Sequence, residues 1–153
     1  MRIVLQRVTR GRVTVGRDTV GAIGVGLVAL VGIADGDRRE DAERLAAKTV
    51  RLRLFADGDR PFHRSVADVD GAVLVVSQFT LMGDVRRGNR PSWSGAADPG
   101  AAEPLVEAYA AAVERGGVHV ERGRFGADMS VTIENDGPVT LLLDSDALGP
   151  GSG

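Results

Sequence analysis

The stretch VGLVALVGI, residues 25–33, decides the fold class of this chain. An unbroken run of apolar, largely β-branched residues bounded by glycine is typical of a buried strand. Upstream, RIVLQRVTRGRVTV at 2–15 carries apolar residues near a period of two, and the short spacing predicts an antiparallel meander. Gly21, Gly24 and Gly26 form turns between these strands, because a phosphate-binding loop would be followed by a helix.

Two helices are expected after this meander. The first runs from Asp37 to about Leu54, with apolar residues at helical spacing. Asp37 and Glu40, three residues apart, form a pattern similar to a capping box. The second helix covers roughly Ala102 to Arg115, and a glycine pair stops it. Pro104 fits this helix only if it lies in the first turn.

The rest of the chain predicts further strands within one domain. Val73–Val76 is a buried strand by its apolar run, and strands return at 118–121, 129–135 and 139–143. The expected fold is α+β: a mainly antiparallel, partly closed sheet or barrel with two helices packed on it. Residues 1–146 form this single domain, and 147–153 form a flexible C-terminal tail.

The composition excludes several classes of protein. With 153 residues, of which 43% are hydrophobic and 26% charged, the chain fits one globular domain rather than a disordered one. It contains no cysteine, so disulfides, thiolate metal sites and a cysteine nucleophile are excluded. No signal-peptide block begins it, and its longest apolar run, about 11 residues, is too short to span a bilayer. We therefore expect a cytoplasmic protein without a membrane partner.

Arginine clusters are the one sign of a nucleic-acid partner, because the net charge is only −2. Residues 1–17 contain several arginines and no acidic residue, and Arg86, Arg87 and Arg90 form a second cluster. The planar guanidinium group suits bidentate contacts with phosphate. The alternative is that these arginines are ordinary solvated charges, since Lys48 is the only lysine and arginine replaces lysine throughout the chain.

Two segments hold the candidate catalytic and binding residues. Ser77, Gln78 and Thr80 directly follow the apolar run at 73–76, and rigid scaffolds often present chemistry where a strand ends. NDGPVT at 135–140 lies between two predicted strands and, taken alone, indicates a tight turn. The chain has only two histidines, far apart in the sequence, so neither a serine–histidine–aspartate triad nor a metal site is expected.

Five motifs carry a family resemblance. SQFTL at 77–81 and NDGPVT at 135–140 occur with QRVTRGRVTV at 6–15, RGNRPSWS at 87–94 and FGADM at 125–129. Because all five motifs occur along the chain in the order expected of the family, the chain from Met1 to Leu143 resembles the D-aminoacyl-tRNA deacylases. It departs from that family at PFHRS, residues 61–65, where a Met-Asn-Leu-Ser type of segment is usual, and in the residues after Asp144.

The resemblance implies chiral proofreading by a homodimer with active sites at the subunit interface. Such enzymes hydrolyse the ester that joins a D-amino acid to the terminal ribose of tRNA, without a cofactor or metal. The Gly137–Pro138 peptide would be cis and would reach into the partner's pocket, with Arg7 as its anchor. Backbone carbonyls there would hold the substrate amino group and leave no room for the Cβ of an L-amino acid. Glycine has no Cβ, so glycyl-tRNA, including glycine mischarged on tRNA-Ala, is expected to be cleaved too.

The same resemblance suggests roles for the SQFTL segment. Ser77 and Gln78 would shape the pocket, and the backbone amides around Phe79 and Thr80 would stabilise the oxyanion. Thr80 is a possible nucleophile, but no base is visible in the sequence to activate it. The reading more consistent with the family is substrate assistance, in which the 2′-hydroxyl of the tRNA directs the attacking water.

The arginine-rich loop is the expected contact with aminoacyl-tRNA. Trp93, the only tryptophan, would stack on the terminal adenine, or would instead serve in loop packing. Arg86, Arg87 and Arg90 would meet phosphates of the acceptor stem, which position a protein on RNA without reading its sequence.

Two other functions remain open from the sequence. A sibling family edits L-alanine mischarged on the wrong tRNA, with a trans Gly-Pro bond and a wider pocket. Its pattern typically has proline at the position of Ser77, so Ser77 and NDGPVT favour the deacylase. The third possibility is a non-catalytic RNA-binding β protein, which would have no need for SQFTL and NDGPVT together.

Overall fold

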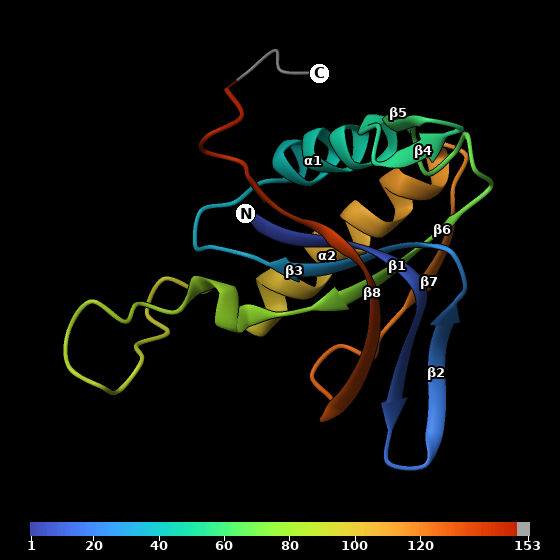
Figure 1. Ribbon diagram of the computed structural model, residues 1–153. Helices are drawn as coiled ribbons and strands as arrows, with labels where there is room; N and C mark the ends of the chain where they lie inside the picture. The colour runs from blue at the N-terminus through green and yellow to red at the C-terminus, as the bar shows by residue number, and fades with distance from the viewer. Residues whose placement is uncertain (150–153) are drawn as a thin grey trace.

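The computed structural model describes residues 1–149 and shows one curved sheet with two helices packed against it (Figure 1). The strand order is β2-β1-β3-β6-β7, with β8 also paired to β1, and a separate hairpin joins β4 to β5. The strands are β1 (Arg2–Val15), β2 (Asp18–Ile23), β3 (Gly26–Gly32), β4 (Phe55–Asp57), β5 (Arg60–Arg64), β6 (Ala72–Ser77), β7 (His119–Arg122) and β8 (Met129–Asp144). The helices are α1 (Arg39–Arg51), the short 3-10 helix η1 (Phe79–Met82) and α2 (Pro99–Arg115).

The predicted fold class is confirmed, and the sheet is mixed. Strand β1 pairs antiparallel with β2, β3 and β8, whereas β3 with β6 and β6 with β7 are parallel pairs. Parallel neighbours need a long crossover, which is usually helical. Helix α1 lies in the connection from β3 to β6, and α2 lies in the connection from β6 to β7. The two parallel pairs therefore account for the two helices.

The two ends of the sheet order, β2 and β7, come together and nearly close a barrel. A Cβ atom built on Gly21 of β2 would lie 2.5 Å from the carbonyl oxygen of Arg122 on β7. No real side chain tolerates that distance to backbone, so the seam requires glycine at this position.

The run at 25–33 is apolar throughout because both faces of β3 are covered. Leu27, Ala29 and Val31 pack into the main core between sheet and helices. Val28, which points the other way, packs into a second core inside the barrel with Leu74 of β6. Alternation between polar and apolar residues is absent from such a strand because neither face meets water.

The main core also contains a buried polar pair. The Tyr109 hydroxyl of α2 and the Thr49 hydroxyl of α1 lie 2.8 Å apart, and Thr49 donates to the Leu45 carbonyl at 2.9 Å. Burial raises the pKa of Tyr109, so its hydroxyl remains the donor to Thr49. This hydrogen bond joins the two helices within the core.

The predicted start of the first helix was wrong. Helix α1 begins at Arg39, and the carboxylate of Asp41, not Glu40, accepts from the Arg38 amide at 3.0 Å. Asp37 instead accepts from the Ala34 amide at 2.6 Å and pairs with the Met1 ammonium, so it closes a loop rather than capping the helix.

Other boundaries moved as well. Helix α2 begins at Pro99, so Pro104 lies inside the helix rather than in its first turn. The segments predicted as two strands at 129–135 and 139–143 belong to one strand, β8, with an outward bulge. Of the tail expected at 147–153, Leu148 packs partly buried against the main core, and 150–153 lie outside the described residues. Neither helix within residues 1–149 is long and apolar enough to cross a membrane.

Candidate functional site

The SQFTL segment turns sharply at the end of β6. Ser77 is the last residue of the strand, and the Gln78 amide donates to the Val31 carbonyl of β3 at 2.7 Å. The chain then enters η1, where the Gln78 side chain donates to the Thr80 hydroxyl. Phe79 is 59% exposed despite its size. The four residues are thus held by two central strands but presented at the surface.

Two backbone amides at this turn are free to bind an anion. Within residues 1–149, the amides of Phe79 and Thr80 donate to no acceptor, because they begin η1. Adjacent amides that point outward from a fixed turn can stabilise the oxyanion formed when an ester is attacked. The structure therefore brings all four predicted catalytic residues, Ser77 to Thr80, to one place.

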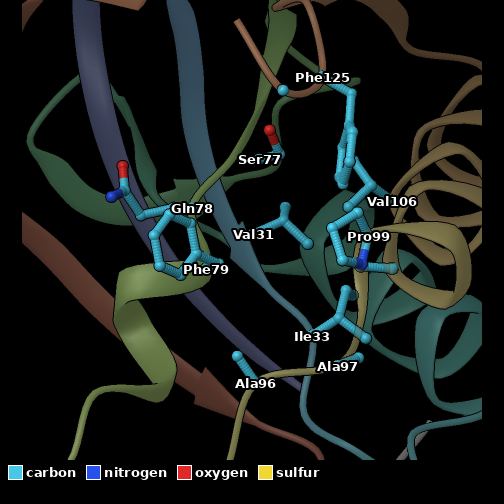
Figure 2. Close-up of a pocket in the computed structure, with 12 residues that line it drawn as sticks. Val31, Ile33, Ser77, Gln78, Phe79, Ala96, Ala97, Pro99, Val106 and Phe125 are labelled. Carbon is cyan, nitrogen blue, oxygen red and sulfur yellow. The ribbon is translucent and has the colours of Figure 1, made fainter. Parts of the chain in front are cut away.

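An apolar cavity of about 380 Å³ opens beside this turn (Figure 2). Its walls come from the end of β3, the start of α2, and the loop that follows β7. Figure 2 shows Ser77, Gln78 and Phe79 along one side and Phe125, Val106 and Pro99 on the other. The lining residues are Val31, Ile33, Ser77, Gln78, Phe79, Ala96, Ala97, Pro99, Ala102, Val106, Phe125 and Gly126.

A second hollow, of about 390 Å³, adjoins the same turn. Ser77, Gln78, Phe79 and Gly126 line both hollows, and Val76, residues 127–129 and Val131 complete the second. The turn that carries the free amides therefore borders two spaces that a substrate can use.

The NDGPVT segment bulges out of the ladder between β1 and β8. The strand register shifts so that residues 136–139 stand opposite Arg7. The side-chain nitrogen of Asn135 donates to the Arg7 carbonyl at 2.9 Å and to the Val139 carbonyl at 3.1 Å, which closes the base of the bulge. Val139 is buried in the main core. The bulge is thus fixed at both ends.

Arg7 lies against this bulge, where the resemblance places an anchor. Its Nε lies 2.8 Å from Asp136 Oδ2, in an ion pair without the alignment of a hydrogen bond, and its terminal nitrogen donates to the Leu54 carbonyl. The Arg7 side chain is only 14% exposed. The Gly137–Pro138 peptide is cis, and both residues are exposed at the tip.

The two groups of predicted site residues do not meet within one chain. Gly137, Pro138 and Arg7 line neither hollow beside Ser77–Phe79. A Cβ atom on Gly137 would come no closer than 3.8 Å to any other atom, that atom being Asn135 Oδ1. The fold of this chain therefore does not itself require glycine at the tip.

The predicted RNA contacts lie on a hairpin that projects from the body between η1 and α2 (Figure 1). Asp84 and Ser92 exchange backbone hydrogen bonds at its base. The Arg86 side chain donates two hydrogen bonds to the Asp84 carboxylate, at 2.9 and 2.7 Å, and its backbone amide donates a third at 2.9 Å. These bonds lower the pKa of Asp84 to about 2. Arg87 and Arg90 are exposed and form no ion pair within residues 1–149.

Trp93 follows this hairpin and packs toward the SQFTL turn. Its ring lies edge-on to Phe79, with centroids 5.5 Å apart, and covers Gly83. The indole remains 42% exposed. Trp93 therefore has a packing partner and also a free surface.

The cavity walls are the residues that the sequence did not assign to the site. Phe125 lies in FGADM, to which the resemblance gives no role, and the sequence predicts Ala102 and Val106 only as residues of a helix. Apolar residues at helical spacing look the same whether they face a filled core or an open cavity. No signal in the sequence separates the two. Within residues 1–149, no group of three or more His, Asp or Glu side chains is arranged to hold a metal ion.

Comparison with known proteins identifies the family. Residues 4–144 match the family described as D-Tyr-tRNA(Tyr) deacylase. The D-aminoacyl-tRNA deacylase of Roseiflexus sp. (strain RS-1) is 57% identical over 145 residues, covering 95% of this chain and 94% of that protein. The D-aminoacyl-tRNA deacylase of Thermus aquaticus is 54% identical, covering 95% of each chain.

Solved structures agree. The c-Myc DNA Unwinding Element Binding Protein superposes with a TM-score of 0.86 at 38% identity, covering 94% of this chain and 98% of that one. A probable eukaryotic D-amino acid tRNA deacylase shares the fold, with a TM-score of 0.79 at 18% identity over 93% of this chain and 97% of that one. Sequence identity above one half across nearly the whole length leaves one assignment: the chain belongs to the D-aminoacyl-tRNA deacylase family, hydrolases of the ester bond in aminoacyl-tRNA.

Proposed function

We propose that this enzyme removes D-amino acids from tRNA as a homodimer, in which the Gly137–Pro138 tip of one subunit completes the active site of the other. One observation carries the proposal. The tip is firmly anchored yet exposed, and it lines neither hollow of its own chain. A second copy of the chain supplies the tip that the active site lacks. The enzyme acts where aminoacyl-tRNA is used, in the cytoplasm.

The open surface around β8 supports pairing of two copies. Strand β8 pairs only with β1 among the described strands, so its other edge carries free backbone groups. Leu142 on this strand is 63% exposed, which is unusual for a large apolar side chain. Edge strands with exposed apolar residues are commonly covered by another chain.

Selection against L-amino acids follows from the shape of the tip. In the dimer, backbone carbonyls of Gly137 and Pro138 bind the substrate amino group. The Cβ of a D-residue then points away from the tip, whereas the Cβ of an L-residue would strike it. The discrimination comes from this clash rather than from attraction, so many D-amino acids are accepted. Glycine, on tRNA-Gly or mischarged on tRNA-Ala, passes the same filter.

The residues at the turn favour hydrolysis directed by the substrate. The free amides of Phe79 and Thr80 stabilise the oxyanion, and the 2′-hydroxyl of the terminal ribose directs water to the ester carbonyl. The residues that line the apolar cavity include no histidine, aspartate, glutamate or lysine, so no general base faces Thr80 from there. Asp128, exposed in the second hollow, makes no hydrogen bond to Thr80.

The projecting hairpin holds the acceptor stem. Arg87 and Arg90 are free for phosphate, whereas Arg86 shares its charge with Asp84. Each lost phosphate contact reduces the slope of log affinity against log salt by about 1. We expect Arg87→Ala with Arg90→Ala to flatten the slope by about 2, and Arg86→Ala with Arg87→Ala by less. An unchanged slope in both double variants would remove these arginines from the RNA surface.

Cleavage of D-tyrosyl-tRNA beside L-tyrosyl-tRNA, without added metal, tests the function. We expect rapid loss of the D-ester, survival of the L-ester, and loss of glycyl-tRNA at similar enzyme concentration. Survival of glycyl-tRNA where the D-ester is cleared would contradict the steric filter. Survival of both tyrosyl esters would contradict the proposed function, and mischarged L-alanyl-tRNA would then be the substrate to assay.

A further inference from the structure

Arg122, at the end of β7, is held by two carboxylates of α2. Its Nε and one terminal nitrogen donate to Glu107 at 3.0 and 2.8 Å, and its terminal nitrogens donate to Glu114 at 2.9 and 3.0 Å. We propose that Arg122 is a positioning residue that sets the width of the apolar cavity by holding the Phe125 loop at a fixed distance from α2. The inference rests on the proposed use of that cavity by the substrate.

Two of the elements that wall the cavity, α2 and the loop after β7, meet at this cluster of Arg122, Glu107 and Glu114, which we call the Arg122 clasp. Val106, next to Glu107 in the chain, comes from α2, and Phe125, three residues after Arg122, comes from the loop. Figure 2 shows these two side chains together on the side of the cavity opposite Gln78. A shift of β7 relative to α2 would therefore change the space between Phe125 and the SQFTL turn directly.

The clasp is one of several contacts that hold β7 and the Phe125 loop. Val120 of β7 and Phe125 pack against the main core, and the Gly123 amide donates to the Val75 carbonyl at 2.8 Å. Within the loop, the Ala127 amide donates to the Arg124 carbonyl at 3.2 Å, and the Arg124 amide makes a weak contact with the Met129 sulfur at 3.3 Å. On the side away from α2, the Arg122 carbonyl lies against Gly21 of β2. Core packing thus fixes the buried face of β7, and the clasp ties the end of the strand, where the Phe125 loop begins, to α2.

The clasp is electrostatically strong for a surface pair. Glu114 and Glu107 lie seven residues apart, hence on the same face of α2, and both engage one guanidinium in a bidentate manner. The hydrogen bonds from Arg122 lower the pKa of Glu114, and those from Glu114 and Glu107 raise the pKa of Arg122. Glu114 and Arg122 therefore stay charged throughout the range in which tRNA esters are assayed.

The two carboxylates differ in where they stand. Glu107 lines a hollow of about 250 Å³ that shares Ser77, Val106 and Phe125 with the apolar cavity. Glu114 lines neither space, although its bonds to Arg122 match those of Glu107. Removing Glu107 leaves the guanidinium held only by Glu114, two turns along α2, whereas removing Glu114 keeps the ion pair beside the cavity. Comparing variants at Glu107 and Glu114 therefore separates an effect on the cavity from an effect on stability.

The experiment compares Glu107→Ala with Glu114→Ala in the full-length protein. We expect similar, small decreases in Tm for both variants, because each loses the same kind of contact. For D-tyrosyl-tRNA, Glu107→Ala should raise KM about fivefold with kcat little changed, since binding of a non-reacting part of the substrate is lost. Glu114→Ala should leave KM unchanged. A non-hydrolysable mimic, D-tyrosine joined to 3′-amino-3′-deoxyadenosine by an amide, should lose affinity by the same factor in calorimetry.

A double-mutant cycle tests whether Glu107 acts through Arg122. The KM effect of Glu107→Ala should disappear in an Arg122→Met background. An effect that persists there, or equal KM values in wild type and Glu107→Ala, would overturn the inference. Failure of the wild-type enzyme to cleave D-tyrosyl-tRNA would instead refute the proposed function. If Arg122→Met does not fold, the two single glutamate variants still decide between the outcomes.

Discussion

Replacing Gly137 by alanine separates the needs of the fold from those of the substrate. In the chain itself the new methyl group would lie 3.8 Å from Asn135 Oδ1, an ordinary contact, and Gly137 lies outside the left-handed region that favours glycine. A glycine-to-alanine change at such a position stabilises a protein by about 0.4–1 kcal/mol, because the unfolded chain loses freedom. We therefore expect Gly137→Ala to fold at least as well as wild type.

Activity should respond in the opposite direction. In the proposed dimer the methyl group projects into the partner's pocket, into the space that also excludes an L-side chain. Displacing the substrate or the tip by about 1 Å costs roughly 10²-fold in rate, or about 2.7 kcal/mol of transition-state free energy. The expected result is a kcat/KM for D-tyrosyl-tRNA about 10²-fold below wild type, with a midpoint of urea unfolding no lower than that of wild type.

Gly24→Ala is the matched control, since a Cβ there meets nothing within 4 Å and the site lies in the turn between β2 and β3. It should change neither stability nor activity by much. Sedimentation of both variants checks that the oligomeric state is kept. Wild-type kcat/KM in a folded Gly137→Ala dimer would refute the argument that this tip enters the active site.

Three further predictions concern other parts of the molecule. Thr49→Val should lower the unfolding free energy by about 2 kcal/mol and Tyr109→Phe by about 1, because only Thr49→Val leaves the buried Tyr109 hydroxyl without an acceptor. Reversed values in urea unfolding would mean that Thr49 is the donor. Because Arg86 lowers the pKa of Asp84 to about 2, the pairing should hold above pH 4 and be lost toward pH 2; carboxyl NMR should show the pKa rising toward 3.8 in Arg86→Ala, and no rise would exclude the pairing in solution. Thr80→Ala should keep more than about a tenth of the wild-type cleavage rate if the ribose directs water, whereas loss of all activity would make Thr80 the nucleophile.

The fold class could be predicted because its signals are local. An apolar run bounded by glycine predicts a buried strand at 25–33, and periodic apolar residues predict the helices. The parallel pairing of β3 with β6 could not be predicted, since strand order depends on contacts between distant segments. The predicted N-cap of α1 was wrong for a similar reason. Asp37 suits an N-cap locally, but the Met1 ammonium and the Ala34 amide compete for its carboxylate.

The turn beside the cavity could be predicted because polar residues there interrupt an apolar strand, whereas its catalytic role stays a prediction. Ser77 and Gln78 are conspicuous after four apolar residues, and the structure places both at the cavity. The cavity walls were not predictable, because Val106 and Phe125 have the composition of an ordinary core. The Arg122 clasp was hidden for another reason. Its carboxylates come from a different helix, and exposed charges give no sign of their partners in the sequence.

The arginines at 1–17 form a basic cluster in the sequence, but the fold pairs several of them with acidic residues. Strand β8 runs antiparallel to β1 and carries an acidic residue beside three of these arginines: Arg2 with Asp144, Arg7 with Asp136, and Arg10 with Glu134. The acids lie more than a hundred residues away in the chain, so the sequence shows the bases without their partners. The hairpin arginines at 87 and 90 meet no such strand. Phosphate affinity depends on charges that the fold leaves unpaired, and within residues 1–149 those of the two clusters are Arg12 and Arg17 of the N-terminal cluster and Arg87 and Arg90 of the hairpin.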